Sequence, residues 1–388
     1  MFTSVSIYFL LTALIFWAYC GYLISLYLLS LFSRNKEGPN LVPSYPDVSI
    51  LVPCLNEETL VDAKIRDIMA LDYPKDKLRV LFLDGGSDDM TCDKIRQFAP
   101  DNGTISLVKT NKRGKVNQIN HVLPDVDTEI IVCSDMDAEM KSDVLKRIAG
   151  VFESDPRVRV AGAMVMPKGG SSLEAQYWED QNVIRLLESE VHSSSIVIAP
   201  CYAFKKGLIR EFPEDCVADD IYISFIANAK GFLVKYLKDA VVYETRTPSS
   251  LSSLITHKFR KGNAFIIEIL RFLYLLPRMH PRWKLIFLTK LLQVIIMPWV
   301  LVFYAISSAS LVLSGLLYVK IVALSATALL LSLFTTSFLM AKKRKSLINR
   351  VRKRVIAGVF IVTNLILLLN GLTFPFYHQS SEFPKVNG

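Results

Sequence analysis

The sequence predicts an α/β domain with a mostly parallel sheet, joined to about four transmembrane helices. Three observations lead to this fold class. Between residues 40 and 260, runs of β-branched and other apolar residues alternate with a helical pattern, which is typical of parallel strands covered by helices on both faces. Long uncharged runs flank this region on both sides. The chain of 388 residues is 51% hydrophobic, which is too apolar for an ordinary soluble domain.

The first region, residues 1–36, is expected to be a transmembrane anchor. Residues 5–32 carry no charge over 28 positions, and a bilayer core about 30 Å thick needs roughly 20 apolar residues in a helix. A buried core helix is the alternative, but an uncharged run of this length favours a membrane span. A cleaved signal peptide would begin with a basic segment. The first six residues, MFTSVS, hold no basic residue, so we expect an uncleaved anchor.

Residues 37–250 are expected to form the α/β domain. Four segments begin with apolar residues and end in polar ones: DVSILVPCLNEE, LRVLFLDGGSDDMT, ISLVKTNKRGK and EIIVCSDMDAE. A helical pattern joins the first two and stops at Pro74. In such a sheet, ligands bind outside the carboxyl ends of the strands. The polar clusters should therefore meet at one edge; they are Asn56 with Glu57, Asp84, Arg113 to Lys115, and Asp135 with Asp137.

The D-x-D segment, Asp135 and Asp137, places two carboxylates one residue apart after an apolar strand. A turn needs at most one aspartate, and two neighbouring carboxylates repel each other. A positive charge between them would relieve the repulsion, and a hard divalent cation is the obvious candidate. The triplet alone is a weak signal, because it also occurs as a solvated turn. The sequence contains no G-x-x-x-x-G-K-[ST] loop, so a P-loop nucleotide hydrolase has no support.

Three further membrane helices are expected in residues 285–376, after interfacial helices, one of them amphipathic, in residues 251–284. The uncharged runs are 291–317, 321–340 and 355–374. The loop 341–354 holds eight Lys or Arg and no acid, and such loops stay in the cytoplasm. This orientation predicts an integral protein of the cell membrane, with the α/β domain in the cytoplasm. Both termini, including the tail 377–388, would lie outside.

The net charge of +9 is explained by this topology and by contact with anionic lipid headgroups. We expect no binding to nucleic acid, because no aromatic-interleaved basic motif or zinc pattern accompanies the charge. The six cysteines show no C-x-x-C spacing. They are expected to be reduced in a cytoplasmic domain.

Taken in order, the motifs resemble those of the family 2 glycosyltransferases, an inverting group with the nucleotide-sugar (GT-A) fold. The resemblance covers residues 48 to about 262, with membrane helices on both sides as in hyaluronan, poly-N-acetylglucosamine and cellulose synthases. SILVPCLNEE is similar to a first strand ending in P-x-x-N-E, and LDGGSDDMT resembles DDGSTDxT with Gly85 at the second Asp. RGKVNQIN, SDMDAE, APCYAFKKGLI and VADDIYISFIANAKGF resemble GKxxALN, the D-x-D, GxxxAFRRxAL and xEDxxLxxRLxxxGY.

The resemblance implies a role for each motif. Asp220 would be the general base that acts on the acceptor hydroxyl, and Asp137 would ligate Mg²⁺ or Mn²⁺. The metal would neutralise the charge of the departing nucleoside diphosphate. The nucleotide sugar would be bound by Pro53, Asn56, Glu57, Asp84, Lys115 and Asp135. The acceptor or diphosphate side would hold Asp219, His257 and Arg260. The alternative for the acid pair is two carboxylates favoured at a helix N-terminus.

One motif departs from the family pattern. Members that build long polymers usually carry Q-x-x-R-W near an interfacial helix, where the Trp stacks on the acceptor sugar. This chain has His257 in place of Gln, Arg260 in place of Arg and Lys261 in place of Trp. A lysine cannot stack in this way, which argues against processive synthesis.

The sequence therefore predicts a metal-dependent hexosyl- or N-acetylhexosaminyltransferase in the membrane. It would transfer a sugar from a UDP-sugar, or less readily a GDP-sugar, to a glycan or lipid-linked acceptor at the cytoplasmic face. A polysaccharide synthase is one form of this hypothesis, and a glycolipid or polyprenyl-phosphate glycosyltransferase with a short product is the alternative. A non-enzymatic transporter or scaffold with a degenerate domain is a third. A transporter would place charged or broken helices at the midplane.

Overall fold

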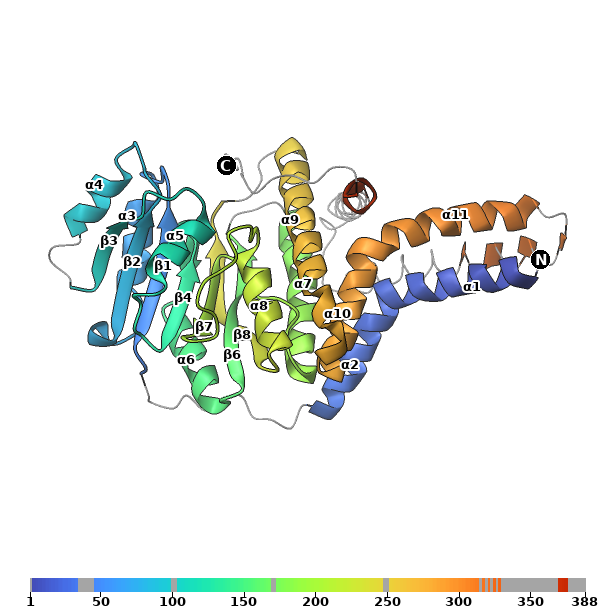
Figure 1. Cartoon of the computed structure of the whole chain (residues 1–388), viewed down its shortest axis with the longest axis horizontal. Helices are drawn as coiled ribbons and strands as arrows, with labels where there is room; N and C mark the ends of the chain where they lie inside the picture. Colours follow the sequence, from blue (N-terminus) through green and yellow to red (C-terminus); the bar gives the residue numbers. More distant parts are fainter. Residues whose placement is uncertain are drawn as a thin grey trace, which may run out of the picture.

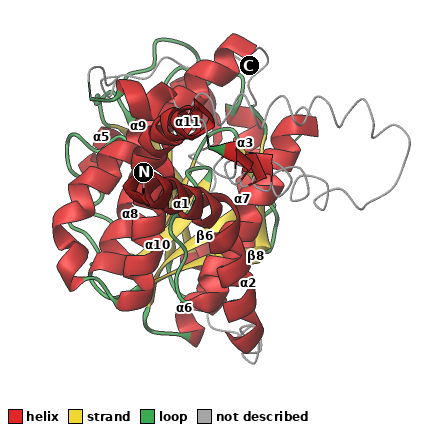
Figure 2. Ribbon diagram, turned by 90° about the vertical axis from the view of Figure 1, so that its right-hand side faces the viewer, coloured by secondary structure: helices red, strands yellow, loops and turns green. Residues whose placement is uncertain are grey.

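The computed structural model describes residues 2–33, 45–98, 103–168, 172–246, 251–313 and 369–375, with scattered positions from 316 to 328. These residues form an α/β domain from which a pair of long helices, α1 and α11, projects (Figure 1). The domain is built around one sheet, and Figure 2 shows helices enclosing it from both sides.

Eight strands make up the sheet, in the order β3-β2-β1-β4-β7-β6-β8-β5. Their bounds are β1 (Val48–Cys54), β2 (Leu78–Asp84), β3 (Ile105–Lys109), β4 (Ile130–Ser134), β5 (Ala138–Met140), β6 (Val158–Pro167), β7 (Cys201–Lys205) and β8 (Leu233–Glu244). The first four are the strands that the apolar segments predict. Each of the four ends at one of the polar clusters or shortly before it.

The sheet is mostly parallel, as predicted, but two of its strands, β5 and β7, run against their neighbours. Neighbours are parallel from β3 through β2 and β1 to β4, and between β6 and β8. Strand β7 runs antiparallel to β4 and β6, and β5 runs antiparallel to β8. The sheet is therefore mixed. The reversal brings the first residues of β7 to the carboxyl edge of β4, where Cys201 pairs with Ser134.

Two hydrophobic cores lie on the two faces of the sheet. One core is formed with α3 (Val61–Met69), α4 (Thr91–Phe98) and α6 (Val144–Ser154), and the other with α5 (Lys115–Val122) and α8 (Asp219–Ala229). In β1, Ile50 and Val52 face the first core and Leu51 faces the second. Because both faces are buried, the strand has a continuous apolar sequence rather than an alternating one.

Two described helices are long and apolar enough to cross a membrane. Ser4–Ser33 covers α1 (Phe2–Phe16), η1 (Trp17–Gly21) and α2 (Tyr22–Ser33), and Pro281–Leu313 covers α10 (Pro281–Leu291), η4 (Leu292–Ile296) and α11 (Met297–Leu313). They correspond to the first two predicted spans. Along α1 and α11, the rings of Tyr8 and Tyr304 stack with centroids 5.1 Å apart.

The remaining predicted membrane elements fall largely outside the described residues. This holds for most of the spans 321–340 and 355–374, for the basic loop 341–354 and for the tail 377–388. Residues 369–373 are helical. The predicted interfacial region comprises α9 (Leu251–Phe272), η3 (Leu273–Arg278) and the beginning of α10.

A buried carboxylate joins the two long apolar helices to the α/β domain. Glu188 lies in α7 (Ser172–Val191) and is fully buried. It accepts hydrogen bonds from the Tyr22 hydroxyl (2.5 Å) and the Ser195 N–H (2.7 Å), and its ion pair with Lys290 measures 3.1 Å. Burial raises the pKa of Glu188, but Lys290 and Ser195 outweigh it and lower the pKa overall. Helices α2, α7 and α10 thus share one neutralised charge.

Candidate active site

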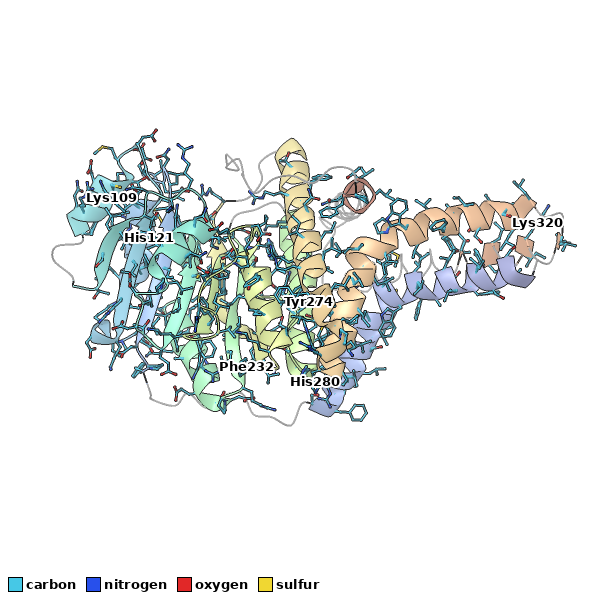
Figure 3. All side chains as sticks on the ribbon, viewed as in Figure 1. Lys109, His121, Phe232, Tyr274, His280 and Lys320 are labelled. Carbon is cyan, nitrogen blue, oxygen red and sulfur yellow. The ribbon has the colours of Figure 1, made fainter. Side chains whose placement is uncertain are left out.

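The predicted polar clusters meet at the carboxyl edge of the parallel strands. Lys109, the last residue of β3 and labelled in Figure 3, marks this edge and pairs in register with Asp84, the last residue of β2. The loops that follow β1, β2 and β4 and the start of α5 come together here through side-chain contacts. The clusters thus meet at one edge of the sheet, as the sequence predicts, and this edge is the candidate site.

Asp84 is a fixed hydrogen-bond acceptor at this edge. It is 2% exposed, and its carboxylate accepts hydrogen bonds from the N–H groups of Gly86 (3.2 Å) and Ser87 (3.0 Å). Burial raises the pKa of Asp84, but the hydrogen bonds from Ser87 and Gly86 outweigh it and lower the pKa. The side chain is therefore ionised and held in one orientation.

Gly85 stands where the resemblance expects a second aspartate, and the structure gives a steric reason. A Cβ at Gly85 would lie 2.1 Å from Nε2 of Gln118 and 2.9 Å from the carbonyl oxygen of Lys112. The Gln118 amide donates to the carbonyl of Cys54 at 3.4 Å. Gln118 thus fills the space that a side chain at position 85 would need.

The loop after β1 is linked to the loop after β2. Asn56 adopts a left-handed backbone conformation, φ 53°, which Asn tolerates better than most residues. Its N–H donates to Ser87 (2.9 Å) and its side-chain oxygen accepts from the N–H of Asp88 (3.0 Å). The N–H of Glu57 donates to the Thr91 hydroxyl at 2.7 Å. Pro53 lies within β1, opposite Leu83.

Asp135 and Asp137 are each paired with a different cation. The Lys115 ammonium lies 2.9 Å from Oδ1 of Asp135. Nε of Arg246 lies 3.1 Å from Oδ2 of Asp137. From the sequence we expected a shared cation to relieve the repulsion between the two carboxylates. In the structure, the side chains of Lys115 and Arg246 relieve it.

Lys115 connects the D-x-D segment to the acid pair at the start of α8. Its ammonium also lies 3.0 Å from Oδ2 of Asp219, and the Tyr202 hydroxyl donates to the same oxygen at 2.5 Å. Burial lowers the pKa of Lys115, but Asp135 and Asp219 outweigh it and raise the pKa well above its ordinary value. Lys115 is therefore a permanent cation between the two acidic motifs.

Asp220 lies beside this chain of ion pairs in the first turn of α8. Its Oδ2 accepts from the N–H of Ala199 (3.0 Å) and its Oδ1 from the N–H of Ile221 (2.9 Å). Burial and then Asp219 raise its pKa to about 6, against the lowering effects of Lys115 and Lys261. A carboxylate with a pKa in this range is ionised at neutral pH and is a stronger base than an ordinary aspartate.

Comparison with known proteins now identifies the family. A family model described as "Glycosyltransferase like family 2" matches residues 46–264, which is more than half of the chain. The chain belongs to this family. The protein is thus a glycosyltransferase, and the predicted family and enzyme class are confirmed.

Two curated relatives of the glycosyltransferase are synthases by name. It is 21% identical over 237 residues to a poly-beta-1,6-N-acetyl-D-glucosamine synthase of Staphylococcus aureus, covering 59% of this chain and 57% of the relative. It is 29% identical over 150 residues to a beta-monoglucosyldiacylglycerol synthase of Trichormus variabilis, covering 38% and 30%. The chain thus matches less than two thirds of the length of either relative.

A solved structure supports the GT-A fold of the glycosyltransferase over nearly its whole length. A mannosyltransferase from Pyrobaculum calidifontis, crystallised with GDP-Man and Mn²⁺, superposes with a TM-score of 0.70. The alignment covers 96% of this chain and 98% of the other, at 24% identity. Because the alignment covers 96% of this chain, the two long apolar helices belong to the shared fold.

Two further residues of the glycosyltransferase escaped the sequence analysis. Arg246, two residues after the end of β8, also binds Oε1 of Glu57 at 3.1 Å. Its position after the apolar segment VVYE was the available signal. Lys64 of α3 is buried beneath the D-x-D segment and donates to the Ser134 hydroxyl (2.8 Å) and the Ala138 carbonyl (2.6 Å). A helical lysine gives no such signal in the sequence.

Of the predicted acceptor-side residues, Asp219 begins α8, whereas His257 and Arg260 belong to α9. Burial lowers the pKa of Arg260, and Asp135 opposes this effect, so the guanidinium feels the charge of the D-x-D segment. The Lys261 ammonium lies 5.4 Å from the centre of the Trp178 ring, which is buried. His257 belongs to α9, but its side chain is outside the described set. A tryptophan is thus present beside the altered motif, supplied by α7.

The residues of the candidate site suit a divalent metal ion whose remaining ligands come from the substrate. Among the described residues, no group of three or more His, Cys, Asp or Glu could hold a metal ion. Asp135 and Asp137 offer hard carboxylate oxygens at the strand edge. Mg²⁺ is commonly bound by one or two carboxylates together with substrate phosphates. The donor set therefore suits a cation that binds with a diphosphate.

Proposed function

We propose that this glycosyltransferase transfers a sugar, with inversion, from a nucleotide sugar to a hydroxyl of a glycan or lipid-linked acceptor at the cytoplasmic face of the membrane. A UDP-sugar is the expected donor and a GDP-sugar the second candidate. The observation that supports this proposal most directly is the pair of salt bridges that Lys115 forms with Asp135 and with Asp219. The Lys115 side chain thus connects the D-x-D segment, which we propose binds the donor, to the acid pair, which we propose acts on the acceptor.

On the donor side, Asp84 and Glu57 would contact the nucleotide and Lys115 would lie near the diphosphate. Asp137 would hold Mg²⁺ or Mn²⁺, with Asp135 beside it. When bound, the metal would supply positive charge to the departing nucleoside diphosphate. Lys64 supports the segment from below, because its hydrogen bonds to Ser134 and Ala138 bracket the three residues 135–137.

On the acceptor side, Asp220 would take the proton of the attacking hydroxyl. The acceptor oxygen forms a bond to the anomeric carbon on the face opposite the diphosphate, and the carbon–oxygen bond to the nucleoside diphosphate breaks. The proton passes to the Asp220 carboxylate. Asp219 is less suited to this task, because Lys115 and Tyr202 already hold its Oδ2. The raised pKa of Asp220, about 6, supports its role as the base.

The product length divides two forms of the proposal. A short or lipid-linked product is supported by Lys261, an exposed cation that stands where polymer-forming relatives carry the stacking Trp. A polysaccharide product is the second candidate, supported by the similarity to the Staphylococcus aureus synthase.

The test is an assay of the full chain, purified in detergent, with a panel of UDP- and GDP-sugars and Mn²⁺. Release of UDP or GDP and the mass of the product would be recorded with membrane lipid extract as acceptor. One donor should be consumed with formation of a glycosylated lipid or glycan. Absence of turnover with every nucleotide sugar, by protein that is folded by circular dichroism, would overturn the proposal.

A further inference from the structure

Arg246 links two loops of the candidate active site that come from different strands. Its Nη2 lies 3.1 Å from Oε1 of Glu57, in the loop after β1, and its Nε lies 3.1 Å from Oδ2 of Asp137, after β4. The Arg246 side chain is 31% exposed, against 11% for Glu57 and 16% for Asp137. The guanidinium therefore covers the two acidic side chains from the solvent side.

The backbone beneath Arg246 is fixed independently of its side chain. The N–H and hydroxyl of Thr245 both donate to the carbonyl oxygen of Asp137, at 3.0 and 2.9 Å. Glu244 pairs in register with Ala138 and accepts from the N–H of Lys168 at 2.8 Å. The main chain at 244–245 would thus stay in place if the guanidinium moved. The several rotatable bonds of an arginine permit such a movement.

The charges determine which partner the guanidinium prefers. Without a donor, two carboxylates face Arg246, and the ion pairs are favourable. A divalent cation on Asp137 would compete for that carboxylate and would repel the guanidinium, because like charges at this range disfavour each other. A diphosphate that arrives with the cation offers several anionic oxygens, and arginine binds phosphate with paired, charge-assisted hydrogen bonds.

We infer that Arg246 exchanges partners during donor binding. It neutralises Asp137 and Glu57 in the donor-free enzyme and binds the diphosphate once the metal is held by Asp137. Lys115, unlike Arg246, should keep its position when the donor binds. Its second partner, Asp219, lies outside the D-x-D segment and holds the ammonium in place. The inference rests on the proposed metal role of Asp137. It predicts that Arg246 opposes binding of the metal alone and favours binding of metal and nucleotide together.

The test compares the full-length wild type with Arg246→Gln in detergent. Binding of Mn²⁺ alone is measured by electron paramagnetic resonance of the free ion. Binding of UDP, or of GDP if the wild type prefers it, is then measured calorimetrically with saturating Mn²⁺. The variant should bind Mn²⁺ alone about twofold to fivefold more tightly, the range expected for loss of a partly exposed ion pair. It should bind the nucleoside diphosphate about tenfold more weakly.

The opposite signs distinguish partner exchange from a structural role. If Arg246 only holds the site together, both affinities fall in Arg246→Gln, and the inference is overturned; unchanged affinities overturn it as well. Arg79→Gln is the matched control, since Arg79 pairs with Asp127 at 3.0 Å in an exposed position. It should leave both affinities unchanged.

Asp137→Asn separates this inference from the proposed function. It should abolish binding of Mn²⁺ alone. If it retains wild-type Mn²⁺ affinity, the metal role of Asp137 fails, and the inference about Arg246 fails with it. If Asp137→Asn loses Mn²⁺ while Arg246→Gln gains no affinity, only the exchange by Arg246 is refuted.

Discussion

Lys115 and Asp219 form an ion pair with 3.0 Å between Nζ and Oδ2, joining the start of α5 to the start of α8. Tyr202 adds a 2.5 Å hydrogen bond to the same carboxylate oxygen. The two adjacent acids, Asp219 and Asp220, therefore have different surroundings. Asp219 is part of the series of ion pairs that reaches the D-x-D segment. Among the described residues, the hydrogen bonds to the Asp220 carboxylate come from backbone N–H groups. The two positions should therefore respond differently to substitution.

Substitution of the proposed base should reduce turnover and spare donor binding. Asp220→Asn keeps the size of the side chain but cannot take a proton. General base catalysis is worth about 10²–10⁴-fold, so kcat should fall by this factor while the Kd for the nucleoside diphosphate changes little. Asp219→Asn should instead raise the KM for the donor, because Lys115 loses a partner. Near-normal transfer by Asp220→Asn would show that Asp220 is not the base. Asp76→Asn, at an exposed position, is the control and should leave both kcat and KM unchanged.

The pH dependence should report the same carboxylate. Burial and Asp219 raise the pKa of Asp220 to about 6, and only its ionised form accepts a proton. Activity should therefore be lost as the pH falls through about 6 and should be constant above it until another group titrates. In Asp220→Asn the residual activity should lack this acidic limb. Rates measured between pH 4.5 and 8 check this, and an unchanged limb in the variant would assign it to another group.

A side chain at position 85 should destabilise the protein. Gly85→Ala would place Cβ 2.1 Å from Gln118 and 2.9 Å from the Lys112 carbonyl. Overpacking of this kind typically costs about 1–3 kcal/mol, so Tm should fall by several degrees in a thermal melt. Adding Gln118→Ala to Gly85→Ala should recover some of the lost stability by removing the side-chain contact. The recovery should be incomplete, because the contact with the Lys112 carbonyl remains. Equal stability of Gly85→Ala and wild type would contradict the packing described here.

The meeting of the polar loops at one edge, which is the candidate site, could be predicted from the sequence, because these loops follow apolar strands whose direction the α/β pattern implies. Three parts could not. Tyr202 reaches the edge because β7 runs antiparallel, and a five-residue strand carries no sign of its direction. Arg246 reaches it because β8 pairs in parallel with β6, a long-range choice. Lys64 has the sequence signature of a surface residue, and only packing shows that it is buried.

The altered acceptor motif gives a test of product length. Lys261→Trp would place an aromatic ring beside Trp178, where the lysine ammonium now lies 5.4 Å from the ring centre. If the missing aromatic residue limits the product, the variant should form longer products, which mass spectrometry would detect. Leu270→Trp, at an exposed position of the same helix, is the control for a general effect of a bulky residue. Long polymer made by the wild type would show that Lys261 does not limit length.

The membrane orientation remains a prediction with a direct test. A single cysteine placed within 341–354 should be protected from an impermeant thiol reagent in intact cells, and one placed after Tyr377 should be labelled. Asp76→Cys, on the surface of the α/β domain, should be protected as well. The native cysteines set the background, which is small because five of the six are buried. The reverse pattern would put the α/β domain outside the cell.

The carboxylate of Glu188 has a consequence for how the protein is made. Its two side-chain partners, Tyr22 and Lys290, come from opposite sides of it along the chain, 166 residues earlier and 102 residues later. The ribosome therefore delivers the first helix long before the lysine that completes the charge balance exists. Until then the acid must remain hydrated, so the junction can close only after most of the chain has been synthesised. Removal of the N-terminal helix should accordingly produce a misassembled protein rather than a soluble enzyme.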